Sequence, residues 1–276
     1  GGMGKSTLGV ALLTLVQAGV GVDEVFQTVK GNCLILDYEA SWEETWRRSS
    51  DVIRGFELET DAMVYYRFCA APLATEVETI RQQIREHDIS VVLVDSAGPA
   101  CGGEPEKADM TLQFFAALRS LSDFDRPVTT ITLAHITKGG GGKNRPFGSV
   151  YWTNLPRNTV ELKKAQKRNA NYIDLALHHR KTNIGTLREP VGFRMTWESG
   201  IHLVPLDVKN HAALGTGGYA DRAEIELREP ENARGITLEA LAETLGIENM
   251  KSFSATLSRD DRFISIDGLW QLNMDY

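Results

Sequence analysis

Short, uninterrupted apolar runs that end in an acidic residue are the feature that most restricts how this chain can fold. The run at 91–94 ends at Asp95, and the run at 33–36 ends at Asp37. Runs of this kind are typical of parallel strands that are buried on both faces. An amphipathic pattern follows at 41–55. Strand and helix patterns in alternation predict an α/β fold with a mostly parallel central sheet.

The same alternation continues along the chain. We expect strands at 63–68 and 128–134, and helices at 76–86 and 112–121. Past residue 148 the pattern changes to short strands, and these are expected to be antiparallel and joined to the edge of the central sheet. They lie at 160–162, 173–177, 193–197 and 201–204.

The C-terminal part is predicted to be a separate small module. Residues 206–230 have little periodicity and include several glycines, which indicates a linker after a core at 1–205. Two helices, at 237–245 and 250–258, precede a hairpin whose turn is Asp267-Gly268. Helix, turn, helix and hairpin is the order of a winged-helix module, which we expect at 231–276.

Bulk properties exclude some classes of protein. The 276 residues carry a net charge of −7, so contact with nucleic acid would depend on local basic patches. No apolar run reaches the roughly 20 residues of a membrane helix, so no membrane association is expected. The three cysteines are scattered, which favours a reducing, cytoplasmic location.

The glycine-rich opening of the chain predicts a phosphate-binding loop. Main-chain N–H groups that lead into a helix N-terminus bind phosphate oxygens, and the helix dipole favours the same negative charge. Lys5 would reach the β- and γ-phosphates of ATP, and Ser6 would bind Mg²⁺. The alternative is a glycine-rich turn at a helix start. The predicted nucleotide-binding residues are Gly2, Met3, Gly4, Lys5, Ser6 and Thr7. Because this loop opens the sequence, we expect an N-terminally truncated core whose first strand is missing.

Polar residues at the strand ends are the other candidates for the site. Asp95 is predicted to hold Mg²⁺ with Ser6, the alternative being a strand-end cap. Glu39 is predicted to activate the attacking water, with Asp37 as the substitute; a solvated loop acid is the alternative. His135 is predicted to sense the γ-phosphate by hydrogen bonding. The alternative is a histidine whose side chain only forms structural hydrogen bonds at the sheet edge.

Basic residues provide two further hypotheses. Arg157, Arg180 and Lys181 are candidates for a cation on the transferring phosphate, and each could also be a surface charge. The loop 138–145 combines four glycines with flanking lysines and an arginine. It suits contact with a phosphodiester backbone, here single-stranded DNA, or is a plain connector.

Taken in order, these segments resemble those of RecA-like AAA family ATPases of the plasmid RepA type, a group that includes hexameric replicative helicases. The resemblance covers roughly residues 1–200 and rests on six segments. These are Gly-Gly-Met-Gly-Lys-Ser-Thr (1–7), Leu-Asp-Tyr-Glu (36–39), Val-Asp-Ser-Ala-Gly-Pro (94–99), Ala-His-Ile-Thr-Lys (134–138), Phe-Gly-Ser-Val-Tyr-Trp-Thr-Asn-Leu-Pro-Arg (147–157) and Lys-Thr-Asn-Ile-Gly (181–185).

The resemblance implies a RecA-like P-loop core, a homo-oligomeric ring, hexameric by this analogy, with ATP at the subunit interfaces, and DNA in its centre. Lys5 and Ser6 would be the Walker A pair, Asp95 the Walker B acid, Glu39 the catalytic base and His135 the sensor. Related helicases have an arginine finger two residues after a lysine, where this chain has Asn183. The finger is therefore Arg180 or Arg157, or there is none.

Three functions remain open from the sequence. The first is an ATP-driven motor or helicase that acts on DNA in replication. The second is an ATP-regulated, DNA-binding regulator whose C-terminal module binds an operator. The third is a recombinase-like filament protein without helicase activity.

Overall fold

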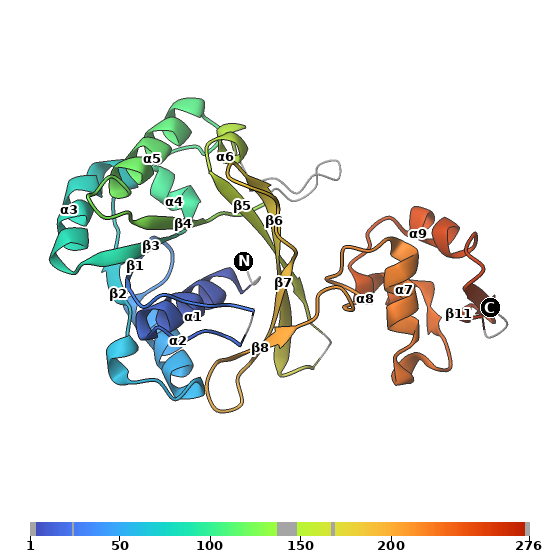
Figure 1. The fold of residues 1–276 in the computed structure, drawn as a ribbon. Coiled ribbons are helices and arrows are strands. Elements are labelled where there is room, and N and C mark those ends of the chain that lie inside the picture. The colour runs from blue at the N-terminus through green and yellow to red at the C-terminus, as the bar shows by residue number, and fades with distance from the viewer. Residues whose placement is uncertain (1–3, 24, 137–147, 167–168, 274–276) are drawn as a thin grey trace. The chain divides into compact units, whose positions relative to one another are not determined.

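The computed structural model is described at all residues except 1–3, 24, 137–147, 167–168 and 274–276 (Figure 1). The chain divides into two compact units. The first contains 1–160, 179–187 and 196–203, and the second contains 161–178, 188–195 and 204–276. None of the helices described is both long and apolar enough to cross a membrane.

A four-stranded parallel sheet forms the centre of the first unit, in the order β2-β1-β3-β4. This confirms the predicted α/β fold with a parallel central sheet. The strands are β1 (Asn32–Asp37), β2 (Tyr65–Phe68), β3 (Ile89–Asp95) and β4 (Thr129–Leu133). The carboxyl ends of all four meet at one edge, since Asp37 pairs with Phe68 and with Asp95, and Asp95 pairs with Leu133.

Helices cover both faces of this sheet (Figure 1). They are α1 (Lys5–Ala18), α2 (Trp42–Gly55), α3 (Leu73–Glu86), α4 (Ala97–Cys101), α5 (Ala108–Leu121) and α6 (Tyr151–Asn154), with a 3₁₀ turn, η1, at Thr60–Ala62. Successive strand residues point to opposite faces. Leu34 and Val92 therefore pack with α3 and α5, while Ile35 and Leu93 pack with α1. This two-sided burial explains why the strands read as continuous apolar runs.

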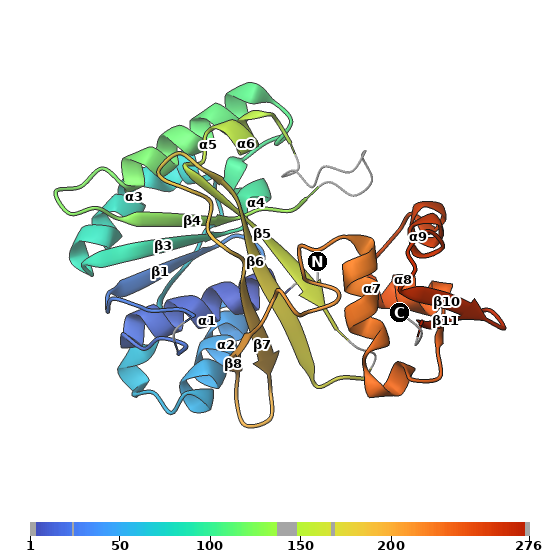
Figure 2. The ribbon, with the colours of Figure 1, turned by 45° about the vertical axis from the view of Figure 1, so that its right-hand side comes forward.

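The strands after residue 157 form a second sheet, which corrects one prediction. β5 (Asn158–Ala165), β6 (Tyr172–Thr182), β7 (Val191–Thr196) and β8 (His202–Leu206) pair in sequence order (Figure 2). Their connections are too short for parallel crossovers, so the strands run antiparallel as expected. The expectation that they join the edge of the central sheet is wrong, because they pair with one another. Sequence periodicity predicts strands but not their partners.

The C-terminal elements of the second unit are three helices and a small antiparallel sheet. The helices are α7 (Tyr219–Leu227), α8 (Leu238–Leu245) and α9 (Met250–Leu257), with a 3₁₀ turn, η2, at Pro230–Asn232. The strands β9 (Ile236–Thr237), β10 (Phe263–Ile266) and β11 (Leu269–Leu272) pair in the order β10-β11-β9. The predicted hairpin is confirmed, and both residues of its Asp267-Gly268 turn have positive φ. The winged-helix assignment itself stays a prediction.

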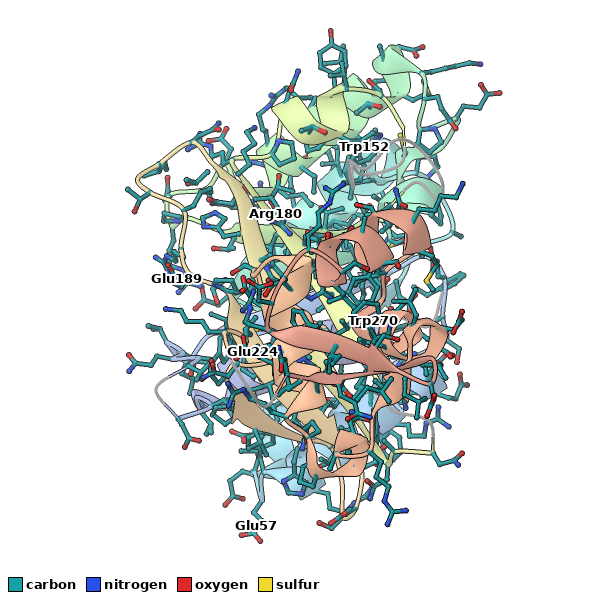
Figure 3. All side chains as sticks on the ribbon, turned by 90° about the vertical axis from the view of Figure 1, so that its right-hand side faces the viewer. Glu57, Trp152, Arg180, Glu189, Glu224 and Trp270 are labelled. Carbon is teal, nitrogen blue, oxygen red and sulfur yellow. The ribbon has the colours of Figure 1, made fainter. Side chains whose placement is uncertain are left out.

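The predicted linker at 206–230 is wrong for the stretch that forms α7. Ala223 and Leu227 of this helix are buried with Phe253 and with Trp270 (Trp270 is labelled in Figure 3). Only two buried apolar side chains mark its inner face, among charged residues and after several glycines. The stabilising contacts come from α8, α9 and the hairpin, so a local pattern could not reveal the helix.

Candidate active site

Helix α1 begins at the loop that was predicted to bind phosphate. Gly4 caps it in the left-handed conformation (φ 75°, ψ 9°), which glycine adopts without strain. The Leu8 N–H donates to the Gly4 carbonyl at 2.9 Å. The first-turn N–H groups have no partner within a helix, so this end attracts anions. Gly2 and Met3 lie outside the described residues, and their predicted role in nucleotide binding remains a prediction.

Close packing holds the start of α1 over the carboxyl edge of the sheet. A Cβ atom on Gly9 would lie 3.0 Å from Cδ2 of Leu93, so only glycine allows the helix to approach β3 this closely without an adjustment. Lys5, one turn earlier, thereby comes close to the ends of the strands. Burial lowers the pKa of Lys5, and the nearby carboxylates of Asp95 and Glu39 oppose that shift.

Asp95 and Ser6 form an oxygen pair at the end of β3. Asp95 is 8% exposed. The pKa of Asp95 is raised, chiefly by burial; the nearby Ser6 hydroxyl lowers it, and the charges of Glu39 and Asp37 raise it further. The structure thus brings together the two residues that were predicted to bind magnesium.

This oxygen pair fits Mg²⁺. The ion prefers oxygen ligands, and proteins commonly hold it with one or two side chains while substrate phosphates and waters complete the octahedron. No group of three or more His, Cys, Asp or Glu suited to a metal occurs among the described residues. Ser6 and Asp95 are therefore suited to a metal that arrives with a phosphate ligand rather than to a closed protein cage.

Glu39 projects from the loop between β1 and α2. Its carboxylate Oε1 accepts a hydrogen bond from Oγ of Ser96, and its main-chain N–H donates to Oδ1 of Asp37 at 3.0 Å. The Glu39 side chain is 42% exposed, whereas Asp37 is 2% exposed. Asp37 also accepts from the Ala40 N–H and the Thr45 hydroxyl. Asp37 therefore supports the loop, and Glu39 is the acid that can reach a water molecule.

His135 follows β4 and lies between Lys5 and Glu39. Its Nδ1 is 3.2 Å from Nζ of Lys5, and its Nε2 is 3.8 Å from Oε1 of Glu39. An ammonium can only donate, so Nδ1 must be the acceptor. In the neutral ring the proton is then on Nε2, on the side that faces Glu39.

The predicted cationic residues are placed differently. Arg157 and Arg180 are both exposed, the latter on β6 (Figure 3). Lys181 is bound at the C-terminal end of α6, where Nζ donates to the carbonyls of Thr153, Asn154 and Pro156 at 3.1, 2.7 and 2.7 Å. Lys181 thus has a clear structural task. The roles of Arg157 and Arg180 as finger residues remain predictions, and the loop 138–145 lies outside the described residues.

Two residues near the site were missed in the sequence. Arg48 on α2 pairs with Glu44, and its charge lowers the pKa of Asp95. Ser96 binds Glu39, as described above. The position of Ser96 directly after Asp95 was a usable signal, whereas Arg48 stands in an ordinary charged helix and gave none.

Comparison with known proteins agrees with this arrangement. The family model described as an AAA domain matches residues 1–141. This range includes α1, the whole parallel sheet and the five residues Lys5, Ser6, Glu39, Asp95 and His135. No protein with a curated description matches the sequence.

Proposed function

The chain belongs to the AAA domain family, and from this premise we propose that it binds Mg-ATP and hydrolyses it at the carboxyl edge of the parallel sheet. One observation carries the proposal. Lys5, Glu39, Asp95 and His135 come from four separate elements and are linked by direct contacts or by charge effects on one another. An ordinary strand-end cap or a solvated loop acid would not require this convergence.

In the proposed reaction, Glu39 accepts a proton from a water molecule while the water oxygen attacks the γ-phosphorus of ATP. The bond from that phosphorus to the bridging oxygen breaks, and ADP carries the electron pair away. Lys5 and the N-terminus of α1 bind phosphate oxygens. Ser6 and Asp95 would hold Mg²⁺, which neutralises charge on the phosphates. His135 links Lys5 to Glu39 and would respond to the γ-phosphate.

We further propose that ATP turnover drives a RepA-type motor, a helicase in DNA replication, that works as a homo-oligomeric ring. The support is the ordered set of segments from the phosphate loop to 181–185. In such a ring a second copy would supply Arg180 or Arg157 to the phosphate, as an arginine finger does. The exposure of both side chains is compatible with this role.

DNA would be bound by the loop 138–145 and by the C-terminal module, for which we propose a winged-helix fold. The charge of the module restricts how it can bind DNA. Acidic residues outnumber basic ones in 231–276, so the module has no general attraction for a phosphate backbone. Contact would depend on local positions such as Lys251 and Arg259 on and after α9.

The test is the ATPase rate with and without single-stranded DNA, combined with a mass measurement of the protein in solution. The Lys5→Ala variant is the inactive control for background ATP hydrolysis. It lacks the one ammonium that we propose to bind phosphate, so its turnover should be abolished. A motor predicts turnover that rises with DNA, strand separation, and a closed oligomer. A palindromic DNA footprint that is independent of ATP would instead support a regulator. An open-ended polymer on DNA would support a filament protein. Equal turnover by Lys5→Ala and the unmodified protein would refute the ATPase itself.

A further inference from the structure

Ser96 is placed as a helix cap but does not act as one. It precedes α4 in an extended conformation (φ −130°, ψ 173°), yet its side chain makes no capping hydrogen bond. A serine at this position normally accepts from an N–H group of the first turn. Here Ser96 is 1% exposed, and its hydroxyl donates to Oε1 of Glu39. The hydroxyl is therefore committed to Glu39 rather than to its own helix.

Glu39 is consequently held at two points. Its main chain is fixed by Asp37, whose Oδ1 accepts from the N–H groups of both Glu39 and Ala40, at 3.0 and 2.8 Å. Its carboxylate is fixed by Ser96. A half-exposed glutamate without such a partner retains the freedom to change rotamer. A base that must meet a water molecule in one geometry gains from this restriction.

The two contacts of the carboxylate fall on the same oxygen. Ser96 binds Oε1, and Nε2 of His135 is nearest to Oε1 as well, at 3.8 Å. With Oε1 engaged in this way, Oε2 is the oxygen that would meet a water molecule. We propose that Ser96 is the positioning residue of Glu39, with Asp37 as the anchor of its main chain, so that Oε2 accepts the proton. This inference rests on the proposed ATPase activity.

The central experiment compares Ser96→Ala with Ser96→Thr. Ser96→Ala removes the donor, and we expect kcat to fall about 10²-fold with KM for ATP and the Mg²⁺ requirement unchanged. Ser96→Thr keeps a hydroxyl and should recover most of the rate. Ser49→Ala is the matched control, because it removes an equally buried hydroxyl, one that bonds to Thr14 away from the site. Its kcat should match that of the unmodified protein.

A double-mutant cycle with Glu39→Gln separates positioning from a general structural effect. If Ser96 acts through Glu39, Ser96→Ala causes no further loss in the Glu39→Gln background. An additional loss of the same size there, or a shifted Mg²⁺ requirement, would show that Ser96 acts through Asp95 instead and would overturn the proposal. An unchanged kcat in Ser96→Ala would overturn it as well.

A crystal structure of Ser96→Ala keeps the inference testable even if the protein shows no turnover. The carboxylate of Glu39 should leave its position or become disordered, while Asp95 stays in place. A Glu39 carboxylate that keeps its position without the Ser96 hydroxyl would refute the inference. Failure of the ATPase proposal is recognised separately, by the absence of a rate difference between the unmodified protein and Lys5→Ala.

Discussion

The ammonium of Lys5 lies 3.2 Å from Nδ1 of His135, although 130 positions separate the two residues in the chain. The contact connects the first turn of α1 to the end of β4. It also sets the direction of the histidine, since Nδ1 must accept from Lys5 and the other ring nitrogen then faces Glu39. His135 therefore lies between Lys5 and the proposed base, 3.8 Å from Oε1 of Glu39.

His135→Ala should separate phosphate binding from hydrolysis. Lys5 remains, so ATP affinity should change little, whereas the link between Lys5 and Glu39 is lost and kcat should fall about 10- to 100-fold. Steady-state kinetics and titration with a fluorescent ATP analogue measure the two effects. His87→Ala is the control, because His87 stacks on Tyr65 and precedes β3, at the opposite end of the sheet. A normal kcat in His135→Ala would exclude the sensor role.

Glu39→Gln should stop hydrolysis while ATP binding persists. The amide keeps the shape of the side chain but cannot accept the proton, so we expect a loss of at least about 10²-fold in kcat. A single-turnover assay beside an equilibrium binding measurement distinguishes the two steps. Glu43→Gln is the control, because it removes the charge of an exposed acid in the first turn of α2. Its kcat should be close to that of the unmodified protein. Hydrolysis by Glu39→Gln at the unmodified rate would show that another group is the base.

Asp174 should make the second unit sensitive to acid. Burial raises its pKa, but hydrogen bonds from Arg194 and His211 outweigh burial and hold the pKa at about 2, below the ordinary 3.8. A lowered pKa means that the stabilisation is present above pH 4 and is lost as the pH falls towards 2. The shift corresponds to about 2 kcal/mol.

Asp174→Asn should therefore lower the free energy of unfolding by about 2 kcal/mol at pH 7, because the amide cannot carry the negative charge that Arg194 stabilises. The difference from the unmodified protein should shrink between pH 4 and pH 2, as measured by urea denaturation across that range. Glu189→Gln, at an exposed pair with Lys209, should have almost no effect. A difference that stays constant with pH would contradict the assignment.

Lys181→Met should act on stability and not on catalysis. Three main-chain carbonyls lose a charged donor at the end of α6, which we expect to cost about 1–3 kcal/mol. Thermal denaturation and kcat are measured on the same preparation. Lys209→Met removes an exposed lysine and is the matched control. A large fall in kcat without a loss of stability would contradict this assignment and indicate that Lys181 acts in catalysis.

Arg180→Ala and Arg157→Ala test the proposed finger in the same assay. Substitution of the arginine that acts as the finger should lower kcat by about 10³-fold or more without changing stability. If a second copy supplies it, mixing that variant with Lys5→Ala should restore some turnover, because each chain then provides what the other lacks. Two variants with normal kcat would mean that the chain uses neither arginine.

Local patterns were sufficient for part of this protein. The runs that end at Asp37 and Asp95 predicted buried parallel strands, and the structure pairs these two residues across β1 and β3. Lys5, Ser6, Glu39, Asp95 and His135 were all selected from the sequence, because loops and strand ends in an alternating α/β pattern converge at one edge. The Asp267-Gly268 hairpin was equally readable, since a two-residue turn is a local feature.

Other features depended on contacts between distant segments. The strands of the second sheet pair with one another rather than with the central sheet. Helix α7 packs against α8, α9 and the hairpin, and Lys181 donates to carbonyls at the end of α6. The hydroxyl of Ser96 binds Glu39 and not its own helix. Periodicity and residue type, which the sequence determined by itself, report the environment of one segment. Which segments meet was decided by the tertiary structure, because strand partners, helix packing and side-chain hydrogen bonds are chosen by the free energy of the whole fold.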